Sequence, residues 1–418
     1  MIGVFKKLFH CLQRFVAKIW RAFFPSLIVI GVTGSYGKTN TVRAIKFALG
    51  KKFSPLATDI NLDTVFNLPL TLLKIRPKNK ALILEYGVDH RGEMETHLRL
   101  IRPQIGVLTG ISPVHAEKEL LGSLSGIIEE KVKLLEALPK TGWAVLNFAN
   151  PHVRQMAKKT EAKIVSYGQK DADFWLKDAK VDLEGTSFLV GLRQGGKEKE
   201  VRVKTKLIGR HFGEEIMAAL AVAKILGIKE EEAAQSLEKL TPLPGRMSLE
   251  KGPKETLLLN DSLRANPAST SAGLKTLAEI PYPGRKIAVL GEMGELGQYQ
   301  EKEHRLIGQK LANLDINFFV GIGNLTHLIW EEAINNGFAK KRAFWAKDVV
   351  EAAQILEKLL KKGDLWYLKG SRLRHLERIL LLLNHERVDC RLISCHNYDH
   401  CRECPRLKHT GLNRMFTG

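Results

Sequence analysis

Apolar and basic residues alternate with the period of a helix along residues 1–24. The apolar positions recur at three- and four-residue steps and, at about 100° per residue, form one stripe: Phe5, Leu8, Leu12, Phe15, Ile19 and Phe23. Cations lie on the opposite side: Lys7, Arg14, Lys18 and Arg21. The pattern predicts a basic amphipathic helix, residues 1–25, that ends at Pro25.

The cations of this first segment are spread through its apolar part, and it contains no acidic residue. Because no small-residue cleavage site follows, the segment is typical of an interfacial membrane helix rather than of a signal peptide. We therefore expect residues 1–24 to contact a membrane surface. The alternative is an ordinary helix that packs on the rest of the protein.

Short apolar runs then alternate with helical stretches. "SLIVIGVTG" predicts a buried strand, and "TNTVRAIKFALG" predicts a helix closed by Gly50. Further strands are predicted at "ALILEYG", "IGVLTGIS", "WAVLN" and "AKIVSYG", with a long helix around "LSGIIEEKVKLLEAL". Residues 172–207 alternate as antiparallel strands do, and "GEEIMAALAVAKILG" predicts another helix. This rhythm is typical of a mostly parallel sheet with helices on both faces.

The segment "LTPLPGRM" carries two prolines and a glycine and predicts a hinge. A second α/β unit follows, with strands at "TLLLNDS", "KIAVLGEMG", "INFFVGIG" and "LWYLKGS" and helices near 268–279, 301–313, 325–336 and 348–362 and up to Leu383. We predict an α/β protein with a central P-loop-type, mostly parallel sheet domain and a C-terminal Rossmann-like domain. The predicted boundaries are 1–25 for the helix, 26–245 and 246–384 for the two domains, and 385–418 for a cysteine-rich tail.

Composition narrows the class of partner. The chain has 418 residues and a net charge of +20, which favours nucleotides, phosphosugars, anionic lipid or nucleic acid, although a lysine-rich proteome gives the same excess. No apolar run approaches the roughly 20 residues of a membrane-spanning helix. Four of the five cysteines lie in the last thirty residues, unlike a secreted disulfide framework. We expect a cytoplasmic protein, peripheral on the inner face of the membrane.

The stretch "GVTGSYGKTNT" between the first strand and the first helix predicts a nucleotide site. Gly34 and Gly37, on either side of Ser35, let backbone amides approach phosphate oxygens. Lys38 can reach the β- and γ-phosphates of ATP, and Thr39 can bind Mg²⁺. The loop is shortened, because Val32 stands where such loops usually have their first glycine.

This shortened loop resembles that of the Mur ligases, ATP-dependent amide-forming enzymes of peptidoglycan synthesis. The resemblance extends over residues 26–384 through "NLDTVFNLPLTLL", "LEYG", "TGISPVHAE", "GSLSGIIEEKVKLL", "VLN", "GRHFGEE" and "PGRM". Nearer the C-terminus, "NDSLRANPAST", "VLGEMGELGQYQEKEH" and "YLKGSR" resemble the branch that adds D-alanyl-D-alanine to a muramoyl-tripeptide. The implied reaction converts a carboxylate into an acyl phosphate, which an amine then attacks.

The resemblance also implies roles for single residues. The implied catalytic residues are Lys38, His115 and Lys131, and the implied Mg²⁺ ligands are Thr39, Glu85, His115 and Lys131, the last as a carbamate. Asn147, Arg246 and Asp261 are implied to lie at the nucleotide, and Asn266, Lys369 and Ser371 at the substrate. Taken singly, each has a plainer explanation: Lys131 as a solvated charge, for example, or Asn266 as part of an Asn-Pro turn.

Three departures from the family qualify the resemblance. Only the amphipathic helix precedes the first strand, where the family has a domain that holds the UDP-sugar, so a partner protein or the membrane is expected to present the acceptor. Phe212 and Glu215 stand where the family has asparagines, and Asp63, Thr64 and Val65 stand where it has Asn-Asn-Glu. The activation residues are retained, so we expect catalysis. The alternatives are a MurT-like ligase that acts on a lipid-linked precursor and a non-catalytic, membrane-docked scaffold.

The tail adds a possible metal site of its own. Cys390, Cys395, Cys401 and Cys404 end in a Cys-x-x-Cys pair, and four thiolates suit tetrahedral, structural Zn²⁺. His396, His400 and His409 are spare ligands. The alternatives are reduced thiols, a redox pair or an iron–sulfur cluster. Few aromatic residues lie nearby, so we do not expect a nucleic-acid partner.

Overall fold

The computed structural model of the chain describes residues 2–59, 64–395 and 401–407. The chain forms two compact units, of which unit 1 comprises residues 1–180, 185–206 and 210–241, and unit 2 comprises residues 181–184, 207–209 and 242–418. Both units combine sheets with helices, so the predicted α/β class is confirmed. Within the described ranges, no helix is long and apolar enough to cross a lipid bilayer.

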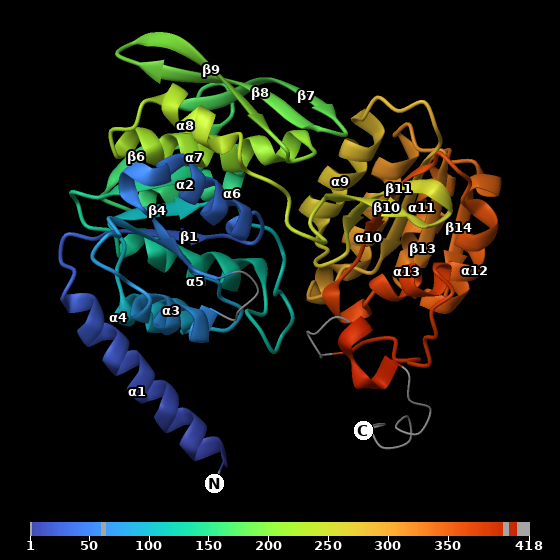
Figure 1. Ribbon diagram of the computed structural model, residues 1–418, viewed down its shortest axis with the longest axis horizontal. Helices are drawn as coiled ribbons and strands as arrows, with labels where there is room; N and C mark the ends of the chain where they lie inside the picture. Colours follow the sequence, from blue (N-terminus) through green and yellow to red (C-terminus); the bar gives the residue numbers. More distant parts are fainter. Residues whose placement is uncertain (1, 60–63, 396–400, 408–418) are drawn as a thin grey trace. The chain divides into compact units, whose positions relative to one another are not determined.

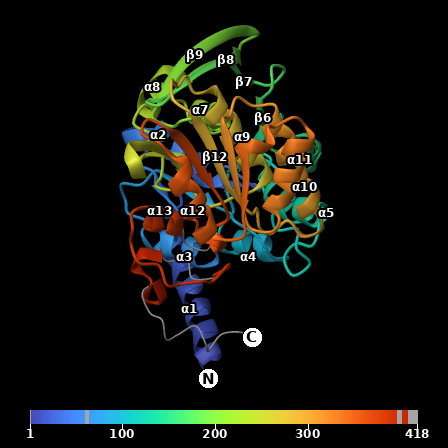
Figure 2. The same ribbon diagram turned by 90° about the vertical axis from the view of Figure 1, so that its right-hand side faces the viewer.

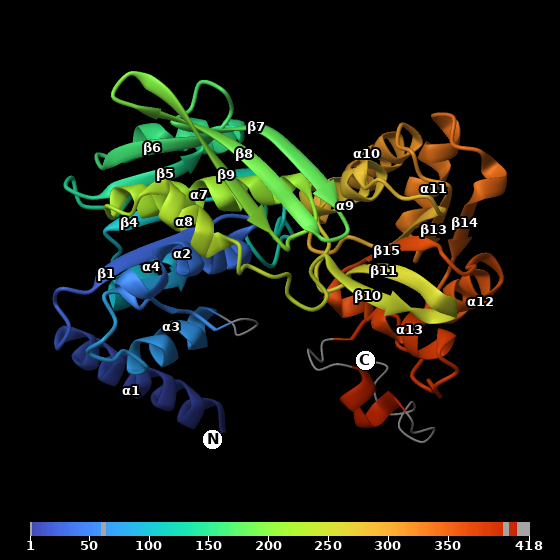
Figure 3. The same cartoon turned by 45° about the horizontal axis from the view of Figure 1, so that its top comes forward.

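Unit 1 is built on a nine-stranded sheet with the strand order β2-β3-β1-β4-β5-β6-β7-β8-β9. Its strands are β1 (Ile28–Thr33), β2 (Leu56–Ala57), β3 (Ala81–Glu85), β4 (Ile105–Leu108), β5 (Trp143–Asn147), β6 (Lys163–Gly168), β7 (Phe174–Asp182), β8 (Gly185–Gln194) and β9 (Lys197–Thr205). The first six strands in this order, from β2 through β1 to β6, pair in parallel. Strands β8 and β9 form the antiparallel ribbon expected from the alternation (Figure 3).

Helices cover both faces of the parallel part of this sheet (Figure 1). One layer contains α2 (Lys38–Phe53), α7 (Gly213–Ile225) and α8 (Glu230–Leu237), and the other contains α3 (Thr64–Leu73), α4 (Glu93–Leu100) and α5 (Leu124–Glu136); α6 (Pro151–Met156) follows β5. The first helix closes at Gly50 as predicted, because Gly50 has a non-helical backbone with a φ of +49°, which glycine adopts at little cost. A second short helical stretch continues across this kink to Phe53.

Parallel pairing brings the carboxyl ends of four strands of unit 1 to one edge of the sheet. Val32 lies opposite Glu85, Thr33 opposite Leu108, and Leu108 opposite Leu146. The loops that follow β1, β3, β4 and β5 therefore meet at this edge, where ligands of open α/β sheets usually bind.

The predicted amphipathic helix is confirmed as α1 (Ile2–Ala22), which lies along α3 (Figure 1). The side chains of residues 1–9, including Phe5, Lys7 and Leu8, are outside the described part. Ala17 is fully buried, the rings of His10 and Phe66 are 4.5 Å apart, and Trp20 Nε1 donates to the Ile75 carbonyl oxygen at 3.3 Å. Helix α1 is thus fixed to unit 1 by small and polar side chains.

Unit 2 contains a six-stranded sheet with the order β10-β11-β15-β12-β13-β14. The strands are β10 (Ser248–Gly252), β11 (Thr256–Asp261), β12 (Lys286–Gly291), β13 (Phe318–Ile322), β14 (Ala343–Ala346) and β15 (Leu365–Lys369). All pairs are parallel except β10 with β11. The sequence did not predict β10 or β14, because "SLEKG" alternates poorly and "AFWA" is only four residues long.

Two helical layers flank this sheet as well (Figure 2). Helices α9 (Pro267–Glu279), α10 (Gln300–Ala312) and α11 (Thr326–Asn335) lie on one face, and α12 (Val349–Leu359) and α13 (Glu377–Leu383) lie on the other. The tail folds back onto α13, where Leu381, Val388, Cys401 and Leu407 form a small apolar cluster. The cysteine-rich segment therefore packs against unit 2.

Candidate active site

The phosphate loop of unit 1 has the backbone geometry that its glycines predict. Gly34 has a φ of +149°, and a β-carbon there would lie 2.0 Å from Thr109 Oγ1. The Ser35 amide donates to the Gly110 carbonyl oxygen at 2.7 Å, which ties the loop to the end of β4. Lys38, the first residue of α2, donates from Nζ to the Gly34 carbonyl oxygen at 2.9 Å. The loop thus sits at a helix N-terminus, where the backbone favours anions.

Two of the predicted magnesium ligands are in contact. Thr39 Oγ1, in the first turn of α2, donates to Glu85 Oε2 at the end of β3 over 2.9 Å. Hydroxyl and carboxylate oxygens are the hard ligands that Mg²⁺ prefers. The parallel register of β1 and β3 explains why these residues, far apart in sequence, meet beside the phosphate loop.

The other two predicted ligands meet at one backbone carbonyl. His115 Nδ1 lies 3.2 Å from the Val88 carbonyl oxygen, and Lys131 Nζ donates to the same oxygen at 3.5 Å. His115 has a φ of +67°, which is a left-handed backbone conformation. Residues other than glycine adopt it at an energetic cost, and such residues often lie at functional sites. The loop after β3, the loop after β4 and helix α5 therefore converge here.

Lys131 lies in the buried stripe of α5, in step with Ile127 and Leu134, and is only 1% exposed. Burial, together with the charge of nearby Lys38, lowers the pKa of Lys131 to about 7. The explanation of Lys131 as a solvated surface charge is therefore wrong. Much of this lysine is a neutral amine near neutral pH, which is the form that reacts with CO₂ to give a carbamate.

An acidic group beside these residues was not predicted from the sequence. Asp89, His90 and Glu93 have potential metal-binding atoms within 4.8 Å of one another. Glu93 Oε2 accepts from the Asp89 amide at 2.8 Å and from the His90 amide at 3.1 Å, so this carboxylate also stabilises the turn. The run "DHRGE", which follows "LEYG" after Val88, was the available signal.

Two glutamates at the start of α7 also adjoin the phosphate loop. A β-carbon on Gly37 would lie 3.2 Å from Glu215 Oε1, and Glu215 Oε2 has no hydrogen-bond partner among the described residues. Burial raises the pKa of Glu214 to about 7 and, with the charge of Glu214, that of Glu215 to about 8. Near neutral pH Glu215 is therefore mostly protonated and Glu214 partly so, which reduces the repulsion of a phosphate.

Asn147 supports this group from the end of β5. Its side chain is fully buried, and its Nδ2 donates to the Thr109 carbonyl oxygen at 2.8 Å and to Glu214 Oε2 at 2.9 Å. The predicted nucleotide residue therefore sits at the correct edge of the sheet, with both amide protons bonded within the protein. Asn147 thus holds the end of β4 and Glu214 in place, and its contact with a nucleotide stays a prediction.

The predicted residues of unit 2 gather at the carboxyl edge of its own sheet. Asp261 ends β11 and Lys369 ends β15, and parallel pairing places them opposite each other. Lys369 Nζ donates to Asp261 Oδ2 at 2.7 Å and to the Arg264 carbonyl oxygen at 2.7 Å, while the Tyr367 hydroxyl donates to Asp261 at 3.0 Å. The charge of Arg246 acts on Lys369 as well, so the hinge arginine lies nearby.

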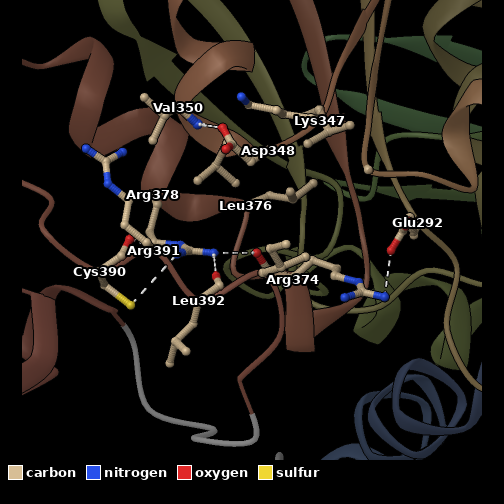
Figure 4. A pocket seen from close by; sticks show the side chains of 14 residues that line it. Glu292, Lys347, Asp348, Val350, Arg374, Leu376, Arg378, Cys390, Arg391 and Leu392 are labelled. Atoms are coloured by element: carbon tan, nitrogen blue, oxygen red, sulfur yellow. Dashed lines mark hydrogen bonds and ion pairs between the residues drawn. The ribbon is translucent and has the colours of Figure 1, made fainter. Parts of the chain in front are cut away.

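Asn266 and Ser371 occupy different structural settings. Asn266 is the N-cap of α9, where its side chain accepts from the Ser269 amide at 2.9 Å in a capping box. The Ser371 amide donates to the Glu292 carbonyl oxygen at 3.2 Å, and Glu292 pairs with Arg374 at 2.6 Å (Figure 4). Asn266 thus has a clear role in starting a helix, and Ser371 lies in the half-exposed loop after β15.

The motif around Met293 and His304 is explained by packing. His304 is fully buried, accepts from the Met293 amide at 3.1 Å through Nε2, and bonds the Gln300 carbonyl oxygen at 2.6 Å through Nδ1. Burial lowers the pKa of His304, which keeps the ring neutral. This histidine fixes the loop after β12 to the start of α10.

The four tail cysteines line one pocket of unit 2, together with His375 and Arg378. Cys390 and Cys401 are buried, and Cys395 and Cys404 are half-buried. One set of potential ligand atoms within 4.8 Å of one another joins Cys401 to His375 and Glu377. His396, His400 and His409, the predicted spare ligands, lie outside the described residues, as does Asp63.

Both units match known sequence families. Residues 32–223 match the Mur ligase middle domain, and residues 245–372 match the Mur ligase, glutamate ligase domain. A UDP-N-acetylmuramoyl-tripeptide–D-alanyl-D-alanine ligase from Bacillus subtilis is 31% identical over 352 residues, which are 84% of this chain and 75% of the relative. The Escherichia coli protein of the same name is 28% identical over 361 residues, which cover 85% and 76%.

Solved structures agree with the sequence matches. MurF from Acinetobacter baumannii has a TM-score of 0.80 at 24% identity and covers 90% of this chain and 81% of that one, which supports the fold. MurF from Thermotoga maritima, in complex with ADP, has a TM-score of 0.75 at 25% identity over 90% and 84% of the two chains. The similarity thus extends through both units.

Proposed function

This chain belongs to the Mur ligase family of ATP-dependent ligases, and we propose that it adds D-alanyl-D-alanine to a muramoyl-tripeptide precursor of peptidoglycan. The relatives at 26–31% identity carry the name of that activity. The observation that carries the proposal is the assembly around the phosphate loop, where Thr39 meets Glu85 and His115 meets Lys131 at one carbonyl.

The residues of this site have two proposed roles, which are to bind the phosphates of ATP and to bind Mg²⁺. The loop amides and Lys38 hold the phosphates of ATP. Thr39, Glu85, His115 and the acids near Val88 suit Mg²⁺, which, when bound, offsets the charge of the transferring phosphoryl group. ATP and Mg²⁺ at this site are the cofactors of the proposal.

Lys131 supplies a ligand only after modification. Its neutral amine adds to CO₂, forming an N–C bond and releasing one proton to solvent. The product is an anion, so it replaces the repulsion between Lys131 and Lys38 with an attraction. Carbamylation thus converts this cation into an anionic oxygen ligand.

Bond formation then proceeds in two steps. The acceptor carboxylate attacks the γ-phosphorus of ATP, giving an acyl phosphate and ADP. The amine of the dipeptide attacks the acyl carbon, the C–O bond to phosphate breaks, and the amine loses a proton. The backbone amides of the loop and Lys38 stabilise the charge that develops on the phosphoryl oxygens.

The test is a reconstitution with the full chain. Purified protein is mixed with ATP, Mg²⁺, UDP-muramoyl-tripeptide and D-alanyl-D-alanine, and the product is identified by mass spectrometry. D-alanine alone serves as the control amine and should give no product. Turnover only with a different acid or amine would overturn the substrate assignment and leave the ligase class in place.

The outward face of α1 favours a lipid-linked acceptor. Six of the eight large hydrophobic side chains that are exposed among the described residues belong to α1 or its end: Leu12, Phe15, Val16, Ile19, Trp20 and Phe23. The helix also packs on α3 through its other side, as the alternative of a helix packed on the protein expects, while the described part of its apolar stripe remains exposed. An uncovered stripe of this kind marks an interaction surface.

Charge points to the nature of that surface. Lys18 is exposed beside the stripe, and the sequence up to Thr58 contains cations but no carboxylate side chain. An apolar stripe beside basic residues suits an anionic lipid surface. Of the two candidates for presenting the acceptor, a partner protein and a lipid surface, the exposed stripe favours the lipid.

Vesicle binding separates these alternatives. The protein should sediment with vesicles that contain phosphatidylglycerol and less with purely zwitterionic vesicles. Phe15→Ser with Ile19→Ser should abolish sedimentation, whereas Ile164→Ser, which removes an exposed side chain elsewhere, should not. Equal sedimentation of all variants, or faster turnover of the UDP-linked acceptor than of the lipid-linked one, would count against membrane presentation.

A further inference from the structure

The tail wraps around the segment that follows the predicted substrate loop. The Cys395 amide donates to the Leu373 carbonyl oxygen at 2.9 Å, and His375 Nε2 lies 3.2 Å from the Cys395 carbonyl oxygen. Leu373 and His375 follow Ser371 directly in the chain, after the end of β15. The cysteine-bearing segment is therefore connected to the loop that carries Lys369 and Ser371.

A buried arginine lies at the centre of this contact. Arg378 is 3% exposed, and its guanidinium donates to the carbonyl oxygens of Cys390 at 3.3 Å and Leu392 at 2.9 Å. The same group lies 3.9 Å from Cys390 Sγ (Figure 4). A buried cation is expensive unless an anion accompanies it. Thiolates bound to a metal in this pocket would supply that anion.

The pocket has the donors that a structural metal needs. All four tail cysteines line it, and none forms a disulfide. Four thiolates around Zn²⁺ carry a net charge of −2, which the Arg378 guanidinium partly offsets. His375, which the sequence did not suggest as a neighbour, also lines the pocket, and it lies close to Cys401. The chemistry of this donor set matches closed, structural zinc sites.

We propose that Cys390, Cys395, Cys401 and Cys404 bind one Zn²⁺, and that the metal holds the loop from Lys369 to His375 in its working position. Binding replaces four S–H bonds with four Zn–S bonds and releases four protons to solvent. The metal takes no part in the reaction. The positioning role rests on the proposed function, because it assigns Ser371 and Lys369 to the substrate, whereas the metal site does not depend on it.

The metal is tested on the purified full chain. Elemental analysis should find about one zinc per chain, as a closed four-ligand site requires. In the native protein a thiol reagent should react quickly only with Cys11, the exposed cysteine of α1, and with all five thiols after chelation under denaturing conditions. Cys401→Ser and Cys404→Ser should lose the zinc, whereas Cys11→Ser should keep it. Metal-free protein with four reactive tail thiols, a disulfide, or the absorbance of an iron–sulfur cluster would overturn the proposal.

The positioning role has its own readout, which does not require a variant. Zinc is removed from the wild-type protein by a chelator and then restored, and amide hydrogen exchange is followed by mass spectrometry. Exchange in residues 369–378 should accelerate without zinc and slow again when it returns, while residues 28–53 serve as the internal control. Unchanged exchange in 369–378 would remove the positioning role and leave the metal site.

Kinetics then connects the metal to the substrate. If the loop holds the incoming amine, zinc removal should raise the KM for D-alanyl-D-alanine about tenfold and leave the KM for ATP unchanged. Equal changes in both constants would indicate general unfolding instead, which contradicts a local role. If no amine is turned over under any condition, the proposed function fails, while zinc content and exchange still decide the metal site.

Discussion

The two sheets carry charge at their carboxyl edges in different ways. In unit 1, the ammonium groups of Lys38 and Lys131 donate to backbone carbonyl oxygens. In unit 2, Lys369 donates to Asp261 and Arg374 pairs with Glu292, so each cation meets a carboxylate. In both units these residues lie at the carboxyl ends of parallel strands, yet the partners of their charged groups differ.

This difference indicates which edge is prepared for a polyanion. Two lysines close enough to lower a pKa are costly to keep together, and ATP or a carbamate on Lys131 relieves that cost. The ion pairs of unit 2 are satisfied without a ligand and hold the loops after β11, β12 and β15 in place. We therefore expect unit 1 to make the main electrostatic contacts to the nucleotide, whereas the ion pairs of unit 2 stabilise its own loops.

The largest expected effect is at the phosphate loop. Lys38→Ala removes the cation nearest the phosphates and should lower turnover by about 10³-fold or more, as loss of other transition-state donors does. Lys46→Ala, on the exposed side of the same helix, should stay near wild-type activity. Turnover is measured as ADP release that depends on the acceptor. A Lys38→Ala enzyme of normal activity would remove the contrast between the units.

The second-largest expected loss of turnover is at Lys131. Lys131→Ala should lose about 10²–10³-fold in turnover, and added short-chain carboxylates should restore part of it by supplying the missing anion. Lys133→Ala, on the same helix, is the control. In the wild-type enzyme, turnover should rise with pH through about 7, because the neutral amine that forms the carbamate becomes available there, and added bicarbonate should help most below that value. Bicarbonate independence throughout would indicate a lysine that is merely buried.

In unit 2 the expected effect is on stability. Lys369→Met leaves Asp261 buried without its cation and should cost about 3 kcal/mol in the free energy of unfolding, part of which the double variant with Asp261→Asn should recover. Lys362→Met removes an exposed partner of Glu255 and should cost less than about 1 kcal/mol. Denaturant unfolding gives these values. If Lys369→Met unfolds like wild type but no longer turns over substrate, this edge is also a ligand site.

Glu215 should show the smallest effect, and one that depends on pH. Its pKa is raised from 4.5 to about 8 in the folded protein, so the unfolded chain releases this proton first and stability falls as pH rises through that window. Glu215→Gln removes the penalty and should raise the melting temperature by about 2–4 °C at the alkaline end, with no gain below pH 4.5. Glu232→Gln, on the surface, should show no such trend. A pH-independent gain would contradict the raised pKa.

Local patterns in the sequence predicted most of the fold. The phosphate loop, the α/β alternation and the antiparallel ribbon over 172–207 depend on neighbouring residues, so they could be predicted without knowing the packing. Helix α1 was predicted from its stripe as well. The stripe could not tell which side packs on the protein, because Ala17 and His10 are inconspicuous in a helical pattern.

Contacts between segments that are distant in the sequence could not be predicted from local patterns. The Val88 carbonyl, which accepts from Lys131 and contacts His115, lies in a third segment and has no side-chain signal. The raised pKa of Glu215 results from burial, which the sequence motif did not show. The pairing of Asp261 with Lys369 follows from strand register across 108 residues. The family motifs predicted that Thr39, Glu85, His115 and Lys131 belong to one site. The catalytic roles of these residues stay predictions.

The packing of α1 has a geometric consequence for unit 1. Because its polar side is fixed to α3, any flat surface that covers Phe15, Ile19 and Phe23 also fixes the tilt of the sheet behind it. A molecule held in this way no longer tumbles freely. It still diffuses in the plane of the surface and rotates about the surface normal. Its encounters with an acceptor anchored in the same surface become a two-dimensional search, in which both reactants already share a common plane.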